Sequence, residues 1–268
     1  MIATMTPHPA WRELIRISVR RVYAYRARML FWLLTTMIQL YLLRAVWTAV
    51  YAGRETLEGI PAESLLVYLT ISALQGYVIP NSIVFEIETR ITTGQVAADL
   101  IRPFNFMKQM VAIQIGSLVG IMPLLVVAVP VAMLVGSLRL PSAENLAAYA
   151  ISFALASVVS VLMWLIIGLS GFWLLDTSGL RSLIYLVSGF LAGSLVPLWF
   201  MPDALRTVIA WLPFQAMTFL PASIFAGQVT GTAIFRPLAV QGLWIMLLLG
   251  LARLVWNRAQ RKLVIQGG

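Results

Sequence analysis

The chain alternates between long apolar runs and short polar interruptions. A helix rises 1.5 Å per residue, so a run of roughly 20 apolar residues can cross the hydrocarbon core of a bilayer, which is about 30 Å thick. The runs predict six membrane-spanning helices, at residues 31–51, 65–85, 110–135, 146–175, 182–198 and 238–256. The fourth run is longer than a bilayer requires, which predicts tilt or a break near Gly168 and Gly171.

The segment 7–26 has a different pattern, with apolar residues at helical spacing on one side and arginines on another. The basic face carries Arg12, Arg16 and Arg20. This pattern predicts an amphipathic helix that lies on the anionic inner leaflet of a membrane. A charge cluster that only orients the first span would look the same, so both interpretations stay open.

The region 200–235 stays apolar but cannot be one helix, because prolines and glycines interrupt it repeatedly. We expect short re-entrant helices here instead of a continuous span. Irregular backbone facing lipid would leave amide groups without hydrogen bonds. The region is therefore expected to be buried in protein, to line a cavity or to lie at the membrane surface.

The composition agrees with a membrane protein, because 60% of the residues are hydrophobic and only 11% are charged. In soluble domains about a quarter of the residues are charged. The net charge of +9 could indicate a nucleic-acid-binding protein, but the basic residues flank the apolar runs. With both termini in the cytoplasm, 14 of the 19 basic residues fall on inner segments and four on outer ones. This bias predicts a multi-pass protein of the plasma (inner) membrane with cytoplasmic termini and no nucleic-acid partner.

The sequence carries no catalytic motif. There is no cysteine and one histidine, His8, which excludes thiolate metal sites and makes a Ser-His-Asp site implausible. A nucleotide-binding loop needs a lysine after glycine, and the only lysines, Lys108 and Lys262, do not follow one. We therefore expect no enzyme activity, metal or cofactor in this chain, and a partner that supplies energy.

Polar side chains inside spans are costly and are candidates for a substrate path. Four qualify: Gln39, Arg44, Gln75 and Asn81. Arg44 is close enough to the outer end of its span to reach the membrane surface, and amides also hold helices together. Both the functional and the structural interpretation remain open for these residues.

Two stretches together resemble the family of type-2 ABC export permeases. The first lies between the second and third spans and comprises Glu86, Ile87, Glu88, Arg90, Ile91, Gly94, Asp99, Leu100, Arg102 and Pro103. The second comprises Pro197, Leu198, Phe200, Pro202, Leu205, Leu212, Pro213, Phe214, Pro221, Phe225, Ala226 and Gly227. The ending 264–268 is similar to one bacterial branch of that family. Each motif is degenerate, and the resemblance depends on their co-occurrence along nearly the whole chain.

The resemblance implies one transmembrane permease domain over 1–268, with an amphipathic connecting helix, a cytoplasmic coupling segment at 86–108 and an extracellular re-entrant region at 200–235 before the last span. The implied partners are membrane lipid, a second permease chain, the same or paralogous, and ABC ATPase subunits that carry ATP and Mg. The implied ATPase-coupling residues are Glu86, Glu88, Arg90, Gly94, Asp99 and Arg102. The implied extracellular gate residues are Pro202, Pro213, Phe214 and Pro221.

Each implied role has a competing interpretation. The coupling residues could belong to an ordinary solvated loop, and the gate residues could simply be helix-breaking residues of a loop. At the level of function, the sequence favours the permease subunit of an ATP-driven exporter. A partner-independent secondary transporter is the main alternative, although inverted repeats and carboxylates within the spans, which that class leads one to expect, are not evident. A structural membrane protein is the third interpretation.

Overall fold

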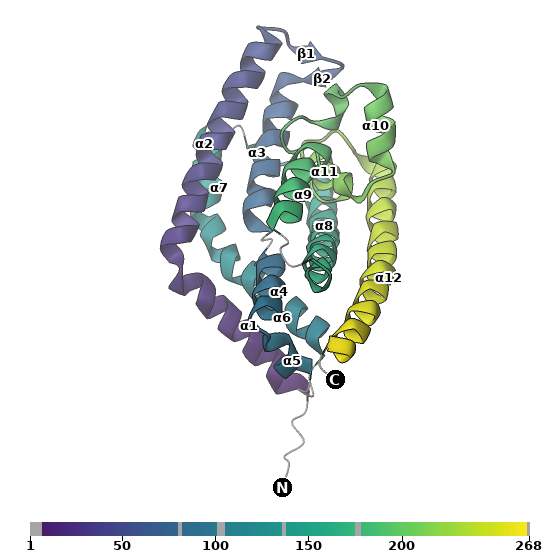
Figure 1. The fold of residues 1–268 in the computed structure, drawn as a ribbon. Helices are drawn as coiled ribbons and strands as arrows, with labels where there is room; N and C mark the ends of the chain where they lie inside the picture. Colours follow the sequence, from purple (N-terminus) through teal and green to yellow (C-terminus); the bar gives the residue numbers. More distant parts are fainter. Residues whose placement is uncertain (1–6, 80–81, 101–104, 136–137, 175–177, 267–268) are drawn as a thin grey trace.

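The protein is an elongated bundle of helices, and its two termini lie at the same end (Figure 1). A computed structural model describes residues 7–79, 82–100, 105–135, 138–174 and 178–266. The helices of the first half are α1 (Pro7–Ala24), α2 (Arg26–Tyr51), α3 (Ala62–Val78), α4 (Ser82–Thr92), α5 (Gln95–Leu100), α6 (Phe106–Ile121), the 3₁₀ turn η1 (Met122–Leu124) and α7 (Leu125–Val135).

The second half is also helical. Its elements are α8 (Ala143–Leu169), η2 (Ser170–Phe172), α9 (Ser178–Leu191), η3 (Leu198–Phe200), α10 (Asp203–Ala210), η4 (Pro213–Ala216), α11 (Phe219–Phe225), η5 (Gly231–Ile234) and α12 (Phe235–Gln266). A small antiparallel hairpin, β1 (Thr56–Leu57) and β2 (Ile60–Pro61), connects α2 to α3. The hairpin and α10 lie at the end opposite to the termini (Figure 1).

Five helical stretches in the described part of the chain are long and apolar enough to cross a membrane: Ala27–Tyr51, Ala62–Thr92, Phe106–Leu134, Ala143–Phe172 and Gly231–Lys262. A sixth arises if α10 and the segment Pro213–Phe225, bent by 76° at the break between them, are counted as one span. The prediction of an all-α integral membrane protein is therefore confirmed.

The second span is not the single helix expected over 65–85. Helix α3 ends at Val78, and Ile79 is extended (φ −87°, ψ 93°) before α4 begins at Ser82. Ile79 precedes Pro80, and the residue before a proline is pushed out of the helical region by the proline ring. The polar segment after this break is mostly helical too, because α4 continues to Thr92.

The third and fourth spans agree better with the sequence. The third starts earlier than expected, because Asn105 caps α6 by accepting a hydrogen bond from the Met107 amide at 2.9 Å. The fourth ends where a break was predicted, since α8 passes into the 3₁₀ turn η2 at Ser170.

The predicted fifth span is wrong in its length. Helix α9 has 14 residues and ends at Leu191, so it rises only about 21 Å and cannot cross the bilayer alone. The chain turns at Gly193, whose φ of +77° is the left-handed conformation that commonly ends helices. The Gly193 carbonyl then accepts a hydrogen bond from the Tyr68 hydroxyl at 2.8 Å, which fixes the turn against α3.

Gly193→Ala should destabilise this turn. A left-handed alanine costs about 1–2 kcal/mol, and the added Cβ would lie 2.6 Å from Leu198 Cδ1 and 2.9 Å from the Tyr68 hydroxyl. Gly227 is the matched control, because its φ is +72° and a Cβ there meets nothing within 4 Å. Thermal unfolding in detergent should show a larger loss for G193A than for G227A; equal losses would mean that the contacts around Gly193 do not matter.

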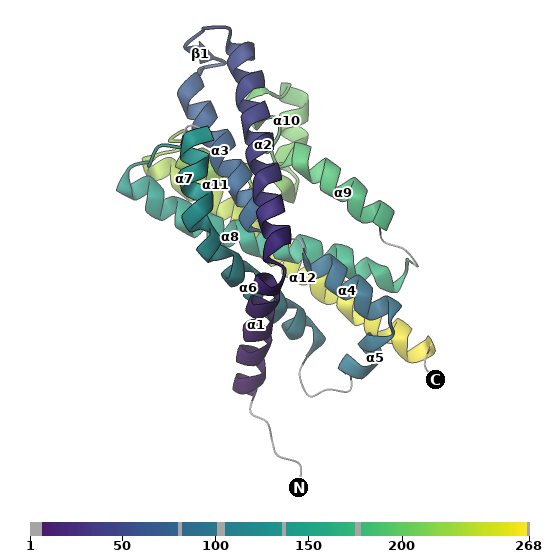
Figure 2. The same cartoon turned by 90° about the vertical axis from the view of Figure 1, so that its left-hand side faces the viewer.

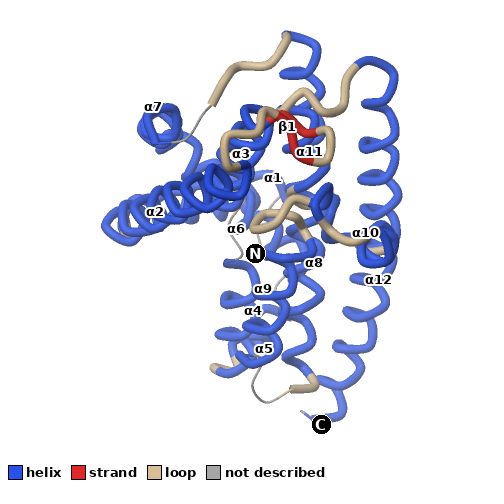
Figure 3. Tube along the Cα trace, turned by 90° about the horizontal axis from the view of Figure 1, so that it is seen from above, coloured by secondary structure: helices blue, strands red, loops and turns tan. Residues whose placement is uncertain are grey.

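The helices pack around two large hydrophobic cores, and two smaller clusters lie beside them. One core joins α4, α6, α8 and α12 and is centred on Ile87, Met110 and Leu165. The other joins α2, α3 and α7 around Leu40 and Leu65. Seen from above, α2 and α7 lie on one side of the bundle and α12 on the other (Figure 3).

Helix α1 bends away from α2 at the elbow near Tyr25 and runs along α6 (Figure 2). Helices α1 and α6 approach each other closely at two glycines of α6. A Cβ on Gly116 would lie 2.5 Å from Ser18 Cβ, and one on Gly120 would lie 2.9 Å from Val22 Cβ. The arginines Arg12, Arg16 and Arg20 are exposed. The predicted amphipathic helix is present, and its buried side faces protein.

Candidate functional site

The charged residues of the predicted coupling segment form a network between α4 and α5. The Arg90 guanidinium donates from Nη1 to Asp99 Oδ2 at 2.6 Å and from Nη2 to Glu86 Oε1 at 3.1 Å. The side chain of Asp99 is 0% exposed and that of Arg90 only 10%. An ion pair this deeply buried is costly to break, because water cannot replace the lost partner. The network therefore holds α5 in a fixed position against α4.

Charged contacts also connect α4 to three other helices. Arg21 of α1 donates to Glu86 Oε2 at 2.7 Å, and Gln109 of α6 accepts from Arg90 Nη1 at 3.3 Å. Arg181 of α9 pairs with Glu88 and places its guanidinium 4.2 Å from the centre of the Phe85 ring. Helices α4 and α5 are thus joined by charge-assisted hydrogen bonds to α1, α6 and α9.

The structure brings together three of the six predicted coupling residues, Glu86, Arg90 and Asp99, whereas Glu88 pairs separately with Arg181 of α9. Gly94 forms the turn between α4 and α5 with a φ of +71°, and Arg102 lies outside the described residues. Arg90 and Asp99 point inward, so their direct contacts are with this chain. Sequence reasoning missed the exposed surface of this turn, where the side chains are small or uncharged: Thr92, Thr93, Gln95, Ala97 and Ala98.

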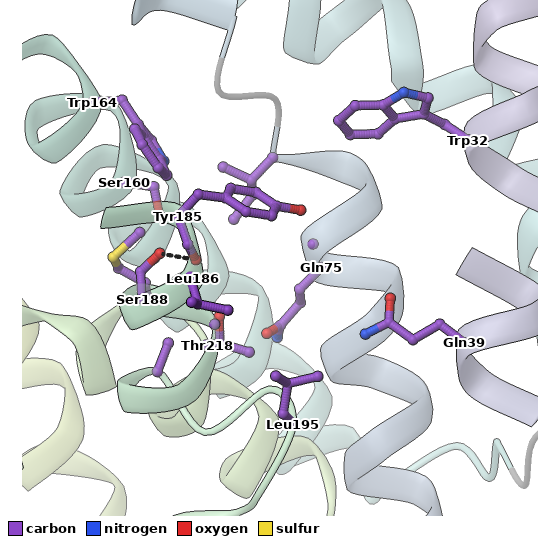
Figure 4. Close-up of a pocket in the computed structure, with 15 residues that line it drawn as sticks. Trp32, Gln39, Gln75, Ser160, Trp164, Tyr185, Leu186, Ser188, Leu195 and Thr218 are labelled. Carbon is purple, nitrogen blue, oxygen red and sulfur yellow. Dashed lines mark hydrogen bonds between the residues drawn. The ribbon is translucent and has the colours of Figure 1, made fainter. Parts of the chain in front are cut away.

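A cavity of about 320 Å³ opens among α2, α3, α8, α9 and the re-entrant segment. Gln39 from α2 and Gln75 from α3 point toward it from one side, and Tyr185 and Ser188 from α9 line the other (Figure 4). The residues that line it include no acidic or basic side chain. The cavity therefore suits an uncharged group that is partly apolar and forms hydrogen bonds.

Gln75 is the most unusual polar residue of this cavity. It is 1% exposed, and neither its amide nitrogen nor its amide oxygen makes a hydrogen bond. The Tyr149 hydroxyl lies beside this amide but forms no hydrogen bond of normal distance and angle with it. A buried amide without hydrogen bonds costs about 1–3 kcal/mol, so this position is the strongest candidate for a ligand contact.

The remaining two predicted path residues are Arg44 and Asn81. Arg44 is half-buried elsewhere on α2 and does not line this cavity. Asn81 lies outside the described residues. Of the four positions predicted from polarity, the structure therefore brings Gln39 and Gln75 to one place.

The predicted gate residues are spread along the re-entrant region. Pro202 is exposed and precedes α10, whereas Pro213 and Phe214 are buried in η4 and Pro221 is buried in α11. The expected succession of short helices is present. Its prolines stand at or near the starts of these helices, where a missing amide hydrogen is tolerated.

Two buried amides that sequence reasoning missed anchor the re-entrant region. Asn145 of α8 donates to the carbonyls of Ile224 at 2.6 Å and Val229 at 3.0 Å. Gln241 of α12, which is 0% exposed, donates to the carbonyls of Ser152 and Ala216, both at 3.0 Å, and accepts from the Ser152 hydroxyl at 2.8 Å. Gln241 could have been identified from the sequence, because it is a single amide side chain inside a long apolar run.

Among the described residues, no group of three or more His, Asp or Glu side chains is placed to hold a metal ion. The bundle, its charged network at one end and its uncharged cavity define a multi-pass membrane protein with a ligand-sized space among its helices. The chain belongs to the ABC-2 family of transporter proteins, because the family model described as "ABC-2 family transporter protein" matches residues 33–267. The resemblance to ABC permeases is thereby confirmed. No curated protein matches the chain.

Proposed function

We propose that this chain is the permease subunit of an ATP-driven exporter, which forms its path with a second permease chain and is driven by separate ATPase subunits that carry ATP and Mg. Membership of the ABC-2 family supports a permease of an ABC transporter. The observation that carries the coupling role is the set of charged contacts of α4. The network around Arg90 connects the α4–α5 turn to α1 and α6, and the Glu88–Arg181 pair connects α4 to α9. A partner that moves this turn would move three helices with it.

In this proposal the ATPase contacts the exposed tip formed by Thr92, Thr93, Gly94, Gln95, Ala97 and Ala98. Glu86, Arg90 and Asp99 keep the tip rigid from within. Rigid attachment matters because a flexible loop would absorb a displacement instead of transmitting it. The tip lies at the end of the bundle that also holds both termini, which supports the cytoplasmic assignment of the termini and of this segment in the plasma membrane (Figures 1 and 2).

The proposed substrate path includes the cavity around Gln75 and Gln39. Because its lining is uncharged, the group that passes it is proposed to be neutral and amphiphilic. The second permease chain is proposed to cover part of α2, whose exposed face carries a row of large apolar side chains: Leu30, Phe31, Leu34, Ile38, Tyr41 and Leu42. Lipid covers the rest.

Co-purification tests the proposal. The tagged chain, extracted gently from its native membrane, should retain an ABC ATPase and, when paralogous, a second permease. Thr93→Trp should reduce recovery of the ATPase several-fold, because it places a large ring on the docking surface. Thr56→Trp is the control, since Thr56 is exposed at the opposite end. A chain that recovers no ATPase, or a Thr93→Trp variant that recovers as much as the control, would contradict the proposal.

A further inference from the structure

A second cavity, which shares Trp32 with the lining of the proposed path, lies at the elbow between α1 and α2. Its volume is about 690 Å³, and it is enclosed by the elbow, the end of α3, α4 and α6. Trp32 and Met29 line its apolar part, and Tyr77 donates a long hydrogen bond to the Met29 carbonyl at 3.5 Å. The hydroxyls of Ser82 and Thr89 line its polar part.

Two arginines give the polar part of this cavity a positive charge. Arg21 comes from the last turn of α1 and Arg28 from the first turn of α2, and both are exposed. The one acidic residue in the lining, Glu86, is engaged by Arg21 at 2.7 Å and by Arg90 at 3.1 Å. The Arg28 guanidinium lies 5.3 Å from the centre of the Tyr25 ring, which holds it at the mouth of the cavity.

The position of the cavity matches the boundary between water and hydrocarbon. The basic helix α1 ends at the elbow, and the apolar span Ala27–Tyr51 begins just after it. A ligand at this level therefore meets arginine donors at one end and aromatic and aliphatic side chains at the other. Arginine binds phosphate oxygens through several N–H groups at once.

We propose that this cavity is a binding site for an anionic phospholipid, whose phosphate contacts Arg21 and Arg28 and whose acyl chain lies along Met29 and Trp32. A phosphate bound there would also touch the Arg21–Glu86 pair, which belongs to the charged network behind the α4–α5 turn. Lipid composition would thus affect the stability of that network. The inference depends on the geometry of the elbow and is independent of the proposed transport role.

Lipid titration of the detergent-purified full-length chain, followed by native mass spectrometry, tests this site. Phosphatidylglycerol should bind about tenfold more tightly than phosphatidylcholine: both carry the phosphate, but the choline ammonium cancels the net charge of phosphatidylcholine and is repelled by Arg21 and Arg28. Arg28→Gln should weaken phosphatidylglycerol binding about tenfold and phosphatidylcholine binding much less, because the lost positive charge no longer repels choline; the preference for phosphatidylglycerol should therefore largely disappear. Arg28→Lys should retain most of the preference.

The controls separate this site from general effects. Arg21→Gln also disturbs the pair with Glu86, so Arg28→Gln is the cleaner variant, and its thermal unfolding in phosphatidylcholine should match that of the unmodified chain. Arg54→Gln removes an exposed arginine at the opposite end and should change nothing. Equal binding of the two lipids, or an Arg28→Gln variant that keeps the preference, would overturn the proposal. Full competition by millimolar inorganic phosphate would overturn it too, because it would assign the site to a free anion.

Discussion

Arg90→Met should lower the free energy of unfolding by about 3–5 kcal/mol, which is the usual cost of removing one partner from a buried ion pair. The Asp99 side chain is 0% exposed, so it would lose the Arg90 guanidinium at 2.6 Å without gaining water in its place. Glu86 would lose its contact with Arg90 at 3.1 Å as well. We expect α5 to detach from α4 and the α4–α5 turn to become susceptible to protease.

Thermal and chemical unfolding in detergent would measure this loss. Arg206→Met is the matched control, because Arg206 pairs with Asp203 on the surface, where an ion pair contributes about 0–1 kcal/mol. The double variant Arg90→Met with Asp99→Leu should recover part of the loss, since no buried charge then remains at this pair. A single variant as stable as the Arg206 control would show that the network does not brace the turn.

Gln241→Leu should destabilise the chain by about 2–3 kcal/mol, given three hydrogen bonds at about 0.6–1 kcal/mol each. Gln241 connects α12 to α8 through Ser152 and to the re-entrant region through Ala216. Leucine has a similar size, so the effect would report the lost hydrogen bonds and not a cavity. The region around η4 should become the most strongly affected part of the protein.

Hydrogen exchange of residues 211–226, together with thermal unfolding, would check this expectation. Gln260→Leu is the control, because Gln260 lies on the same helix and is only half-buried. If both variants lose the same stability, the change would reflect a general property of α12. If Gln241→Leu leaves exchange in this region unchanged, Gln241 does not anchor the re-entrant segment.

The sequence was sufficient to predict an all-α membrane protein, because the length of an apolar run decides whether its helix can cross the bilayer. The predicted limits of the spans were wrong where a proline or a glycine ends a helix inside an apolar run. Helix α3 ends at Val78, because Ile79 precedes a proline in the sequence and leaves the helical region, and Gly193 ends α9 well before the predicted limit. The proline and the glycine were both visible in the sequence, but the choice of a left-handed turn at Gly193 depends on Tyr68, 125 positions away.

The site was predicted less completely than the fold. The pairing of Glu86 with Arg90 follows from their spacing of four residues on one helix. The pairing of Arg90 with Asp99 does not, because it depends on how the turn at Gly94 folds α5 back onto α4. Spacing could not show that these charges point inward while uncharged side chains face outward. Spacing also could not predict that Asn145 donates hydrogen bonds to carbonyls 79 and 84 positions further along the chain.

The proposed exporter role depends on the α4–α5 turn being the surface that a cytoplasmic ATPase contacts. The chain contains no cysteine, so a single cysteine at Gln95, where the side chain is exposed, can carry a photoreactive crosslinker without background from other positions. Crosslinking in native inverted membranes, with the crosslinker at Thr56 as the comparison, measures that contact directly. We predict an adduct with an ABC ATPase from position 95 and none from position 56. Adducts with an ATPase from position 56 alone, or from neither position when the ATPase is present in the membrane, would contradict the account.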